Sequence, residues 1–327
     1  MMSKLVTIYG GSGFIGRYIA RRMAKKGWRV RIAVRRPNEA LFVKPYGVVG
    51  QVEPVLCNIR DDESVASALR GADVVVNCVG LLQEKAKNTF NSVQNKGADR
   101  IARLAASEGV VRIVHVSAIG ADINADSDYA KSKAMGEANI LKHMPNAVIL
   151  RPSIVFGAED QFFNRFASMA RFGPLLPIVG AETKFQPVSV DDVAEAAVLG
   201  ITGIAKPGIY ELAGPDQDTF RGLMYRMLKV IQRRRLVLDV PMFMARLMAA
   251  SFEMGNKLTF GIAPVPMTRD QVKSLSVDNV PSGEFPGFEK LGIEPVSMVS
   301  VLPEYLWPFR VSGQFAEIKS SAKNLKS

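Results

Sequence analysis

The chain has 327 residues, of which 48% are hydrophobic and 22% are charged, and its formal net charge is +11. This length accommodates one large globular domain with a smaller lobe, or two modest domains. No run of about 18 apolar residues is free of charge or proline, which excludes a membrane-spanning helix. The positive charge suits an anionic lipid surface, an acidic protein or simply a soluble basic surface, and without a nucleic-acid motif we expect no nucleic-acid partner.

A glycine-spaced turn follows the first predicted strand, at residues 5–8, and opens into a helix. This spacing lets the turn be tight, lets the backbone approach a pyrophosphate and lets the helix pack closely on the sheet. The unpaired N–H groups at the start of the helix favour negative charge. The turn therefore predicts the phosphate side of a dinucleotide site, and the alternative is a glycine-rich turn without a ligand. The residues expected at the dinucleotide are Gly10, Gly13, Phe14, Ile15 and Gly16.

The amino terminus and the cysteines and histidines restrict the compartment and the chemistry. Met1–Lys4 lead directly into the first strand, so we expect neither a secretory signal nor a mitochondrial presequence. Cys57 and Cys78 lie in apolar contexts without metal-ligand spacing, which predicts reduced structural thiols in a cytoplasmic compartment. His115 and His143, the only histidines, are expected to be structural, so no metal site is predicted.

The second predicted strand, residues 28–34, ends in two arginines. A site that prefers NAD carries an acidic residue about 20 positions beyond the glycines, where it binds the adenosine ribose. Arg35 and Arg36 stand there instead. Because guanidinium groups pair with a phosphate and a carboxylate repels it, these residues predict NADP(H) as the cofactor. The alternative is that both arginines only solvate the end of the strand.

Predicted strands and helices alternate without interruption as far as residue 116. This alternation is typical of a doubly wound parallel α/β sheet of the Rossmann type, in which ligands bind at the carboxyl ends of the strands. Asn58, Val79 and Gly80 follow two of the strands, and we expect them beside the cofactor. The strands are expected at 52–56, 74–80 and 113–116, and the helices at 61–69 and 90–104.

Three residues with the chemistry of hydride transfer follow the strand at 113–116. Ser117 stands at the strand end, and Tyr129 and Lys133 are four residues apart on one face of the next helix. An ammonium lowers the pKa of a nearby phenol and can hold the nicotinamide ribose, and a serine hydroxyl can bind the reacting oxygen. These residues predict the nicotinamide side of the site. Each also has a structural alternative: a turn cap for Ser117, an exposed ring for Tyr129 and a solvated charge for Lys133.

These motifs resemble the extended and atypical short-chain dehydrogenase/reductase superfamily over the first two thirds of the chain. The resemblance implies that the segment at 151–157 passes beside the nicotinamide, which makes Pro152 and Ile154 expected contacts. It also implies that the segment at 188–194 returns to the nucleotide domain from a substrate lobe. The resemblance rests on Gly10–Gly16, Ser117, Tyr129, Lys133, Arg151–Gly157 and Val188–Ala194.

Later segments resemble, more specifically, the nicotinamide-binding accessory subunits of respiratory complex I, over nearly the whole chain. This resemblance implies a tightly held NADPH, a structural role with the cofactor not turned over, and partners among complex I subunits near the quinone-binding region, where the hydrophilic arm meets the membrane. It implies a place on the cytoplasmic face of a bacterial inner membrane or the matrix side of the mitochondrial one. Without a presequence, a bacterial member or a mature chain is expected. The segments are Phe166–Pro174, Gln186–Val188, Thr268–Val272 and Gly287–Ile293.

The expected domains are a nucleotide-binding domain at 1–160, with 185–215 returning to it, a smaller α/β lobe at 161–310 and a polar tail at 311–327. In the lobe, the stripe of aromatic and methionine side chains at 162–172 predicts a packed helix face. The apolar segment at 241–252 can be a core helix, an interfacial membrane helix or a face for a partner protein. Anionic lipid would be attracted by the nearby Arg233, Arg234 and Arg235.

Three functions remain open at this point. The first is the complex I accessory subunit. The second is a free NADP-dependent oxidoreductase or epimerase in which Tyr129 is the general acid/base, supported by Lys133 and Ser117. The third is a nucleotide-sensing regulator. The sequence does not decide whether the three side chains turn over a substrate or only hold the cofactor.

Overall fold

The computed structural model describes residues 3–259 and 265–311 and divides the chain into two compact units. The first unit contains the residues up to Ser153, together with Val190–Ala213 and Pro281–Pro295. The second contains Ile154–Ser189, Gly214–Val280 and the residues from Val296 onward. The sequence-based boundary at 160 therefore differs from that of the structure, which assigns 154–160 to the second unit and 281–295 to the first. The expected tail lies, from residue 312 on, outside the described residues.

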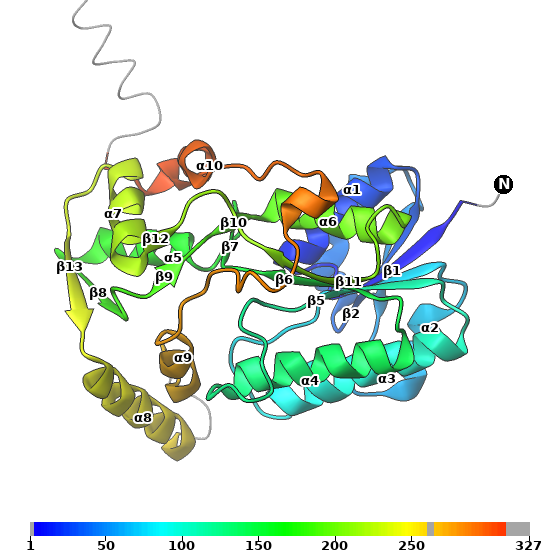
Figure 1. The fold of residues 1–327 in the computed structure, drawn as a ribbon, viewed down its shortest axis with the longest axis horizontal. Coiled ribbons are helices and arrows are strands. Elements are labelled where there is room, and N and C mark those ends of the chain that lie inside the picture. The colour runs from blue at the N-terminus through cyan, green and yellow to red at the C-terminus, as the bar shows by residue number, and fades with distance from the viewer. Residues whose placement is uncertain (1–2, 260–264, 312–327) are drawn as a thin grey trace, which may run out of the picture. The chain divides into compact units, whose positions relative to one another are not determined.

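A seven-stranded sheet in the order β11-β6-β5-β4-β1-β2-β3 forms the centre of the first unit (Figure 1). All its neighbouring strands run parallel. The strand order reverses where β1 lies between β2 and β4, and ligands of such sheets bind at the carboxyl ends of the strands beside that point. The strands are β1 Leu5–Tyr9, β2 Arg29–Val34, β3 Val52–Leu56, β4 Val74–Asn77, β5 Arg112–Val116, β6 Val148–Pro152 and β11 Gly208–Leu212.

Helices cover both faces of this sheet, with α3 and α4 on one face and α1 and α6 on the other (Figure 1). The predicted doubly wound α/β fold is confirmed. The expected helix at 90–104 begins as a π-helical turn, η2 Asn91–Asn95, before α3. The helical elements are α1 Phe14–Lys25, η1 Pro37–Tyr46, α2 Asp62–Leu69, α3 Lys96–Ser107, α4 Asp128–His143, α6 Val190–Thr202 and η3 Phe288–Leu291.

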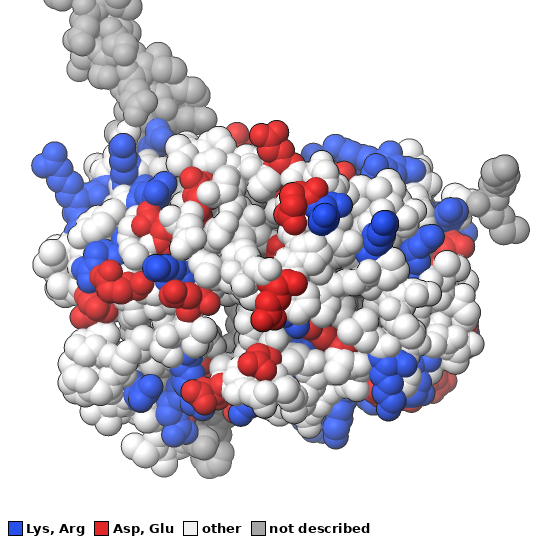
Figure 2. Space-filling view, in the orientation of Figure 1, with Lys and Arg blue, Asp and Glu red and all other residues white. Residues whose placement is uncertain are grey.

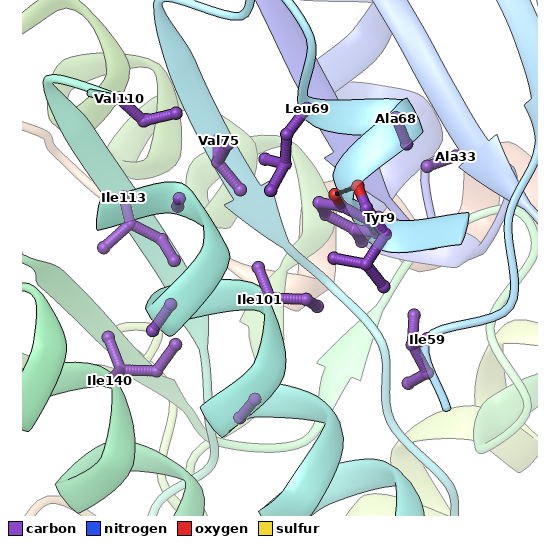
Figure 3. Close-up of a cluster of buried hydrophobic side chains, with 14 of the residues drawn as sticks. Tyr9, Ala33, Ile59, Ala68, Leu69, Val75, Ile101, Val110, Ile113 and Ile140 are labelled. Atoms are coloured by element: carbon purple, nitrogen blue, oxygen red, sulfur yellow. Dashed lines mark hydrogen bonds between the residues drawn. The ribbon is translucent and has the colours of Figure 1, made fainter. Parts of the chain in front are cut away.

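The apolar core on the α3 and α4 face is built from side chains that alternate along the strands. Figure 3 shows Tyr9, Leu69, Val75 and Ile101 gathered between the sheet and the helices. The Tyr9 hydroxyl donates to the Val65 carbonyl at 2.9 Å, so this buried ring leaves no unpaired polar atom in the core. Burial raises the pKa of the Tyr9 phenol far above its ordinary value. The aliphatic packing around Tyr9 and its hydrogen bond to α2 therefore hold the end of β1, where the glycine turn begins.

The opposite face is closed by α6, which belongs to the returning segment. Arg22 on α1 forms ion pairs with Glu195 and, at 3.2 Å, with Asp191 on α6. Gly200 allows α6 to approach the sheet, because an added Cβ would lie 2.9 Å from a Val114 methyl group. The close approach explains why a small residue stands at this position of the helix.

The second unit has a core of aromatic, methionine and aliphatic side chains. Phe162, Phe163, Phe166 and Met169 pack in this core, as the aromatic stripe predicted. The prediction was wrong for Phe172, whose side chain is 88% exposed, because α5 turns this position away from the core. The elements are β7 Val155–Phe156, α5 Phe163–Phe172, β8 Leu175–Val179, β9 Lys184–Phe185, β10 Val188–Ser189, β12 Asp218–Thr219, α7 Phe220–Val230, β13 Leu236–Val240, α8 Met242–Leu258, α9 Arg269–Ser274, α10 Met298–Leu306 and η4 Trp307–Phe309.

Helix α8 contains the apolar segment that the sequence left open. Ala245 and Ala249 are buried in a small cluster of the second unit, and Met242 packs against this cluster partly buried. Phe243 and Leu247 are 71% and 69% exposed, and Met254 is exposed as well. Figure 2 shows uncharged surface over the amino-terminal part of α8 on the face in view. The described helices include none with the length and hydropathy needed to cross a membrane.

Candidate functional site

The glycine turn between β1 and α1 is shaped by close backbone contacts. Gly10 has a φ of +73°, in the left-handed region that favours glycine. An added Cβ at Gly16 would lie 2.5 Å from the Gly10 carbonyl oxygen, so the helix can start against the turn only with glycine there. Gly13 is the N-cap residue of α1, and no side chain caps this end of the helix. The first N–H groups of the helix, at Phe14 and Ile15, are thus not occupied by a capping side chain, and an anion there stays a prediction.

Arg17 is a residue of this turn that the sequence reasoning missed. Its guanidinium donates to the carbonyls of Ser12 and Gly13, at 3.1 and 3.3 Å, and lies over the Phe42 ring at 4.8 Å. The contacts place a positive charge at the amino-terminal end of α1. Figure 2 shows basic side chains gathered over this helix. The sequence did offer a signal for this residue, because a basic side chain stands directly after Gly16, one helical turn beyond Gly13.

The two arginines after β2 lie on the surface near the glycine turn. The Gly10 N–H donates to the Ala33 carbonyl at 3.0 Å, which joins the turn to the end of β2. Arg36 forms an exposed ion pair with Glu39 at 3.0 Å. Such a pair contributes little to stability, so a stronger anion can replace the carboxylate. Arg35 is exposed, and no ion pair joins it to another described residue.

Val79 and Gly80 follow β4 and lie against both ends of the site. An added Cβ at Gly10 would lie 3.3 Å from a Val79 methyl group, and one at Gly80 would lie 3.4 Å from the Lys133 ammonium. These two residues thus bring the glycine turn and α4 together. Asn58, by contrast, is occupied locally, because its Oδ1 accepts from the Arg60 backbone N–H at 3.2 Å.

Ser117 stands at the end of β5 with a hydroxyl that has no partner. Its side chain is 4% exposed, and none of the described residues hydrogen-bonds to Oγ. The turn-cap alternative is therefore not what the structure shows. A buried hydroxyl without a partner costs free energy, about 1–3 kcal/mol, and this cost is removed when a ligand supplies the bond. The orphaned hydroxyl fits a polar ligand at the end of β5.

Tyr129 and Lys133 lie on one face of α4, as their spacing predicted. The ammonium of Lys133 is 6.0 Å from the centroid of the Tyr129 ring, and the ring packs edge-on against Phe90. The prediction that the ammonium lowers the pKa of the phenol is corrected here. Burial raises the pKa of Tyr129 to about 12. The phenol therefore stays protonated at neutral pH in the free chain.

The Lys133 side chain is buried rather than solvated. Its Nζ donates to the carbonyl of Val116 at 3.1 Å, one residue before Ser117. Burial lowers the pKa of Lys133 to about 8, while Glu137 and Cys78 act in the opposite direction. A buried ammonium with a single recorded acceptor has further N–H groups to offer a ligand. This arrangement favours a binding role for Lys133.

His115 and Asn77 hold the ends of β5 and β4 together. Asn77 Oδ1 accepts from the Val79 N–H at 3.1 Å, so its amide nitrogen faces His115 Nδ1, also at 3.1 Å. The nitrogen must then donate, which assigns the ring proton of His115 to Nε2. Burial lowers the pKa of His115 to about 3, and Lys133 contributes in the same direction. The histidine is thus neutral and structural, as the sequence predicted.

Gln94, in the π-helical turn, was not identified from the sequence. Its Oε1 accepts from the Ser132 hydroxyl at 2.9 Å, and its Nε2 donates to the Leu81 carbonyl at 3.3 Å. These two bonds tie α4 to the loop that follows Gly80. Only the π-helical turn signals this role, since such turns are frequent at functional sites.

The segment after β6 contributes to both units. Pro152 is buried at the end of β6, and its carbonyl accepts from the Ile119 N–H at 3.0 Å. Ile154, the other contact expected from the resemblance, belongs to the second unit, where it packs on the aromatic core. Among the described residues no group of histidine, cysteine or acidic side chains can hold a metal ion.

The first unit therefore assembles most of the predicted site residues at the carboxyl ends of its strands. Glycine backbone, an uncapped helix end and an orphaned hydroxyl fit a dinucleotide: the N–H groups suit the pyrophosphate, and Ser117 and Lys133 suit the nicotinamide riboside. The arginines after β2 follow the strand end that is bonded to the glycine turn. Cys57 and Cys78 are free thiols, and burial raises the pKa of the Cys78 thiol to about 12.

Comparison with known proteins gives a consistent result. Residues 6–213 match the model of the NAD dependent epimerase/dehydratase family. The chain is 31% identical over 316 residues, 94% of its length, to NADH dehydrogenase (ubiquinone) 1 alpha subcomplex subunit 9, mitochondrial, of Arabidopsis thaliana, of which it covers 79%. It is 30% identical over 311 residues, also 94% of its length, to the mitochondrial NADH-ubiquinone oxidoreductase 40 kDa subunit of Neurospora crassa, of which it covers 80%.

A solved structure supports the fold. The UDP-glucose 4-epimerase of Thermus thermophilus, determined in complex with NAD, superimposes with a TM-score of 0.69 over 94% of this chain and 99% of the epimerase. The sequence identity is 19%, so this likeness concerns the fold alone.

Proposed function

This chain belongs to the NAD dependent epimerase/dehydratase family and, within it, to the group of complex I alpha subcomplex subunit 9 proteins, and from this premise we propose that it is an accessory subunit of a respiratory NADH:ubiquinone oxidoreductase. The observation that carries the proposal is similarity to such subunits over 94% of the chain, including the second unit. A likeness confined to the nucleotide domain would have shown only the fold.

The subunit binds NADPH and does not turn it over. Bound at this site, the cofactor would offer hydride transfer from its nicotinamide. Gly10, Gly13 and Gly16 would hold the pyrophosphate, and Ser117 and Lys133 would hold the nicotinamide riboside. A protonated Tyr129, whose pKa burial raises to about 12, is a poor base, which supports retention without turnover. Tyr129 then serves as a further donor to the cofactor.

The choice of NADPH over NADH depends on Arg35 and Arg36. Both side chains are exposed after β2, and among the described residues Arg36 forms an ion pair with Glu39. A 2′-phosphate carries more charge than a single carboxylate and can accept from both guanidinium groups. These contacts favour the phosphorylated cofactor.

The partners are other complex I subunits near the quinone site, and the protein lies peripherally on the membrane. The exposed apolar side chains of α8 and the basic net charge support this placement. The two mitochondrial relatives favour the matrix side of the inner membrane, and the cytoplasmic face of a bacterial inner membrane is the equivalent place in a bacterium.

Gentle solubilisation of native membranes tests this function. The chain should co-purify with complex I subunits and carry NADPH in a one-to-one ratio, both read by mass spectrometry. Recovery of a protein without respiratory subunits that exchanges its nucleotide freely would contradict the proposal.

That outcome would favour a second function, a free NADP-dependent oxidoreductase or epimerase. The specific observation behind it is that Ser117 is present at the end of β5, and Tyr129 and Lys133 in α4. In that enzyme the raised pKa of Tyr129 makes the phenol a general acid, able to protonate a reduced carbonyl oxygen.

A further inference from the structure

Glu137 is the acidic residue closest in sequence to Lys133, but its carboxylate does not pair with the buried Lys133 ammonium. Glu137 lies one turn further along α4, a spacing at which lysine and glutamate ordinarily pair. Yet Lys133 donates to the Val116 carbonyl, and no ion pair joins it to a described carboxylate. Both side chains are buried, so solvent does not explain their separation.

Glu137 is instead occupied by Arg151 of β6. The guanidinium donates to both carboxylate oxygens, Nε to Oε1 at 2.9 Å and the terminal nitrogen to Oε2 at 2.6 Å. Arg151 is itself held from the other side by Glu211 at 3.8 Å and by the Phe285 ring at 4.7 Å. This two-pronged geometry fixes the carboxylate against β6, because a planar guanidinium binds it in one orientation.

We propose that Arg151 and Glu137 are positioning residues of the nucleotide site: by keeping the carboxylate away from Lys133, they leave its ammonium free to bind the ribose of the dinucleotide and couple cofactor binding to the protonation of Lys133. The inference rests on the proposed function, since it needs a dinucleotide at this site. It concerns residues that act on the cofactor through Lys133.

Lys133 is the group of this site that changes charge near neutral pH. The groups that face it are Tyr129 and Glu137 on α4, Cys78 after β4 and His115 on β5. Burial raises the pKa of Tyr129 and of Cys78 to about 12, and it lowers that of His115 to about 3, so all three are neutral. The pKa of Lys133 is lowered to about 8.

The sign of the coupling follows from the charged form. The dinucleotide favours the ammonium, which donates hydrogen bonds, over the neutral amine. Cofactor affinity is therefore nearly constant below about pH 7 and falls above it, by at most about tenfold per pH unit for one proton. A carboxylate paired with Lys133 would raise its pKa and move this fall to higher pH.

Two substitutions shift the coupling in opposite directions. Glu137→Gln removes the acidic influence on Lys133 and should lower its pKa by about one unit, which weakens NADPH binding about fivefold at pH 8. Arg151→Lys keeps a positive charge but cannot bind both carboxylate oxygens, so Glu137 is released toward Lys133 and the pKa rises. Glu195→Gln, which alters an arginine-bound carboxylate on the opposite face of the sheet, is the matched control.

The test measures two quantities on the full chain. The pKa of Lys133 is read by ¹⁵N-lysine NMR without cofactor, assigned with Lys133→Met, and the NADPH dissociation constant is measured by fluorescence from pH 6.5 to 9.5. Thermal unfolding shows that each variant is folded. We expect the pKa to increase from Glu137→Gln through the unaltered chain and Glu195→Gln to Arg151→Lys, with the fall in affinity following the same order.

The experiment distinguishes a failure of the proposed function from a failure of this inference. No NADPH binding by the unaltered chain at any pH contradicts the proposed function. Binding that does not depend on pH, or one Lys133 pKa in all folded variants, overturns this inference and leaves the proposed function intact.

Discussion

The polar groups around β4 and β5 divide into those that satisfy one another and those left for a ligand. Asn77, His115 and Val79 are joined by two hydrogen bonds, and Gln94 is joined to Ser132 and to the loop after Gly80. The Ser117 hydroxyl has no such partner among the described residues. Because buried polar groups are almost always paired, the unpaired Ser117 hydroxyl is a candidate contact for a ligand, although the Nε2 atom of the His115 ring is also without a partner in the described part of the chain. The mutually bonded groups thus hold the strand ends together, and the Ser117 hydroxyl is a group that can contact a ligand.

The proposed choice of NADPH over NADH rests on two single residues and can be tested at them. Replacing Arg35 and Arg36 with Ala should weaken NADPH binding at least tenfold and leave NADH binding nearly unchanged, because only the 2′-phosphate loses charge-assisted bonds of about 1.5–3 kcal/mol each. Dissociation constants for both cofactors are measured by fluorescence titration. The double variant Arg21→Ala, Lys25→Ala removes the same charge from exposed positions of α1 and should change neither. Equal losses for both cofactors would mean that the arginines do not recognise the phosphate.

At the scale of elements, side-chain periodicity predicted where helices form better than it predicted which of their side chains are buried. The aromatic stripe predicted a packed face of α5, yet Phe172 lies outside it, because the helical period turns this position away from the face of Phe163, Ala167 and Ala170. In α8 the large apolar residues Phe243, Leu247 and Met254 are exposed. Among the described side chains of this helix, Ala245 and Ala249 are the ones fully buried. An apolar run indicates that some surface must be buried, but not by what.

The exposed face of α8 allows a test of docking that spares the fold. Phe243→Ser with Leu247→Ser should reduce co-purification with respiratory membranes several-fold and leave the midpoint of thermal unfolding almost unchanged, because both side chains are already exposed. Phe172→Ser, at the exposed end of α5, is the control and should leave membrane association intact. Unchanged co-purification of the double variant would show that α8 does not mediate the association.

The whole molecule consists of two units whose segments interleave along the chain. The sheet of the first unit is completed by β11, and Glu211 on this strand accepts from the Ser282 N–H at 2.6 Å and its hydroxyl at 3.0 Å. The buried carboxylate of Glu211 therefore holds the segment at 281–295 against β11. Segments far apart in the sequence must assemble together, so loss of the first unit should be one cooperative transition.

Acid should destabilise the molecule through His115. Its pKa is 6.5 in a model peptide and is lowered to about 3 by burial, so the unfolded chain binds a proton that the folded chain rejects. The free energy of unfolding is then fully present above pH 6.5 and falls as the pH decreases toward 3, by at most about 1.4 kcal/mol per unit. Denaturant unfolding at a series of pH values measures this slope. This slope of unfolding free energy against pH should be shallower in His115→Gln than in His143→Gln, which removes the other histidine. Equal slopes in the two variants would show that His115 does not cause the loss of stability in acid.

The sequence by itself determined the parallel α/β architecture, the glycine turn and the face of α4 that carries Tyr129 and Lys133. These depend on local spacing: glycine positions, apolar runs and the 3.6-residue period each follow from neighbours along the chain. The place of Gly10, Val79 and Gly80 at one edge also followed, because parallel strands end on the same side of a sheet.

Only the tertiary structure decided the electrostatics and the boundaries. The raised pKa of Tyr129, the occupied carboxylate of Glu137 and the orphaned hydroxyl of Ser117 depend on burial and on partners distant in sequence, such as Arg151. The assignment of 154–160 and 281–295 to their units likewise depends on long-range contacts. Spacing along a chain states which side chains share a face, whereas desolvation depends on everything that folds over it.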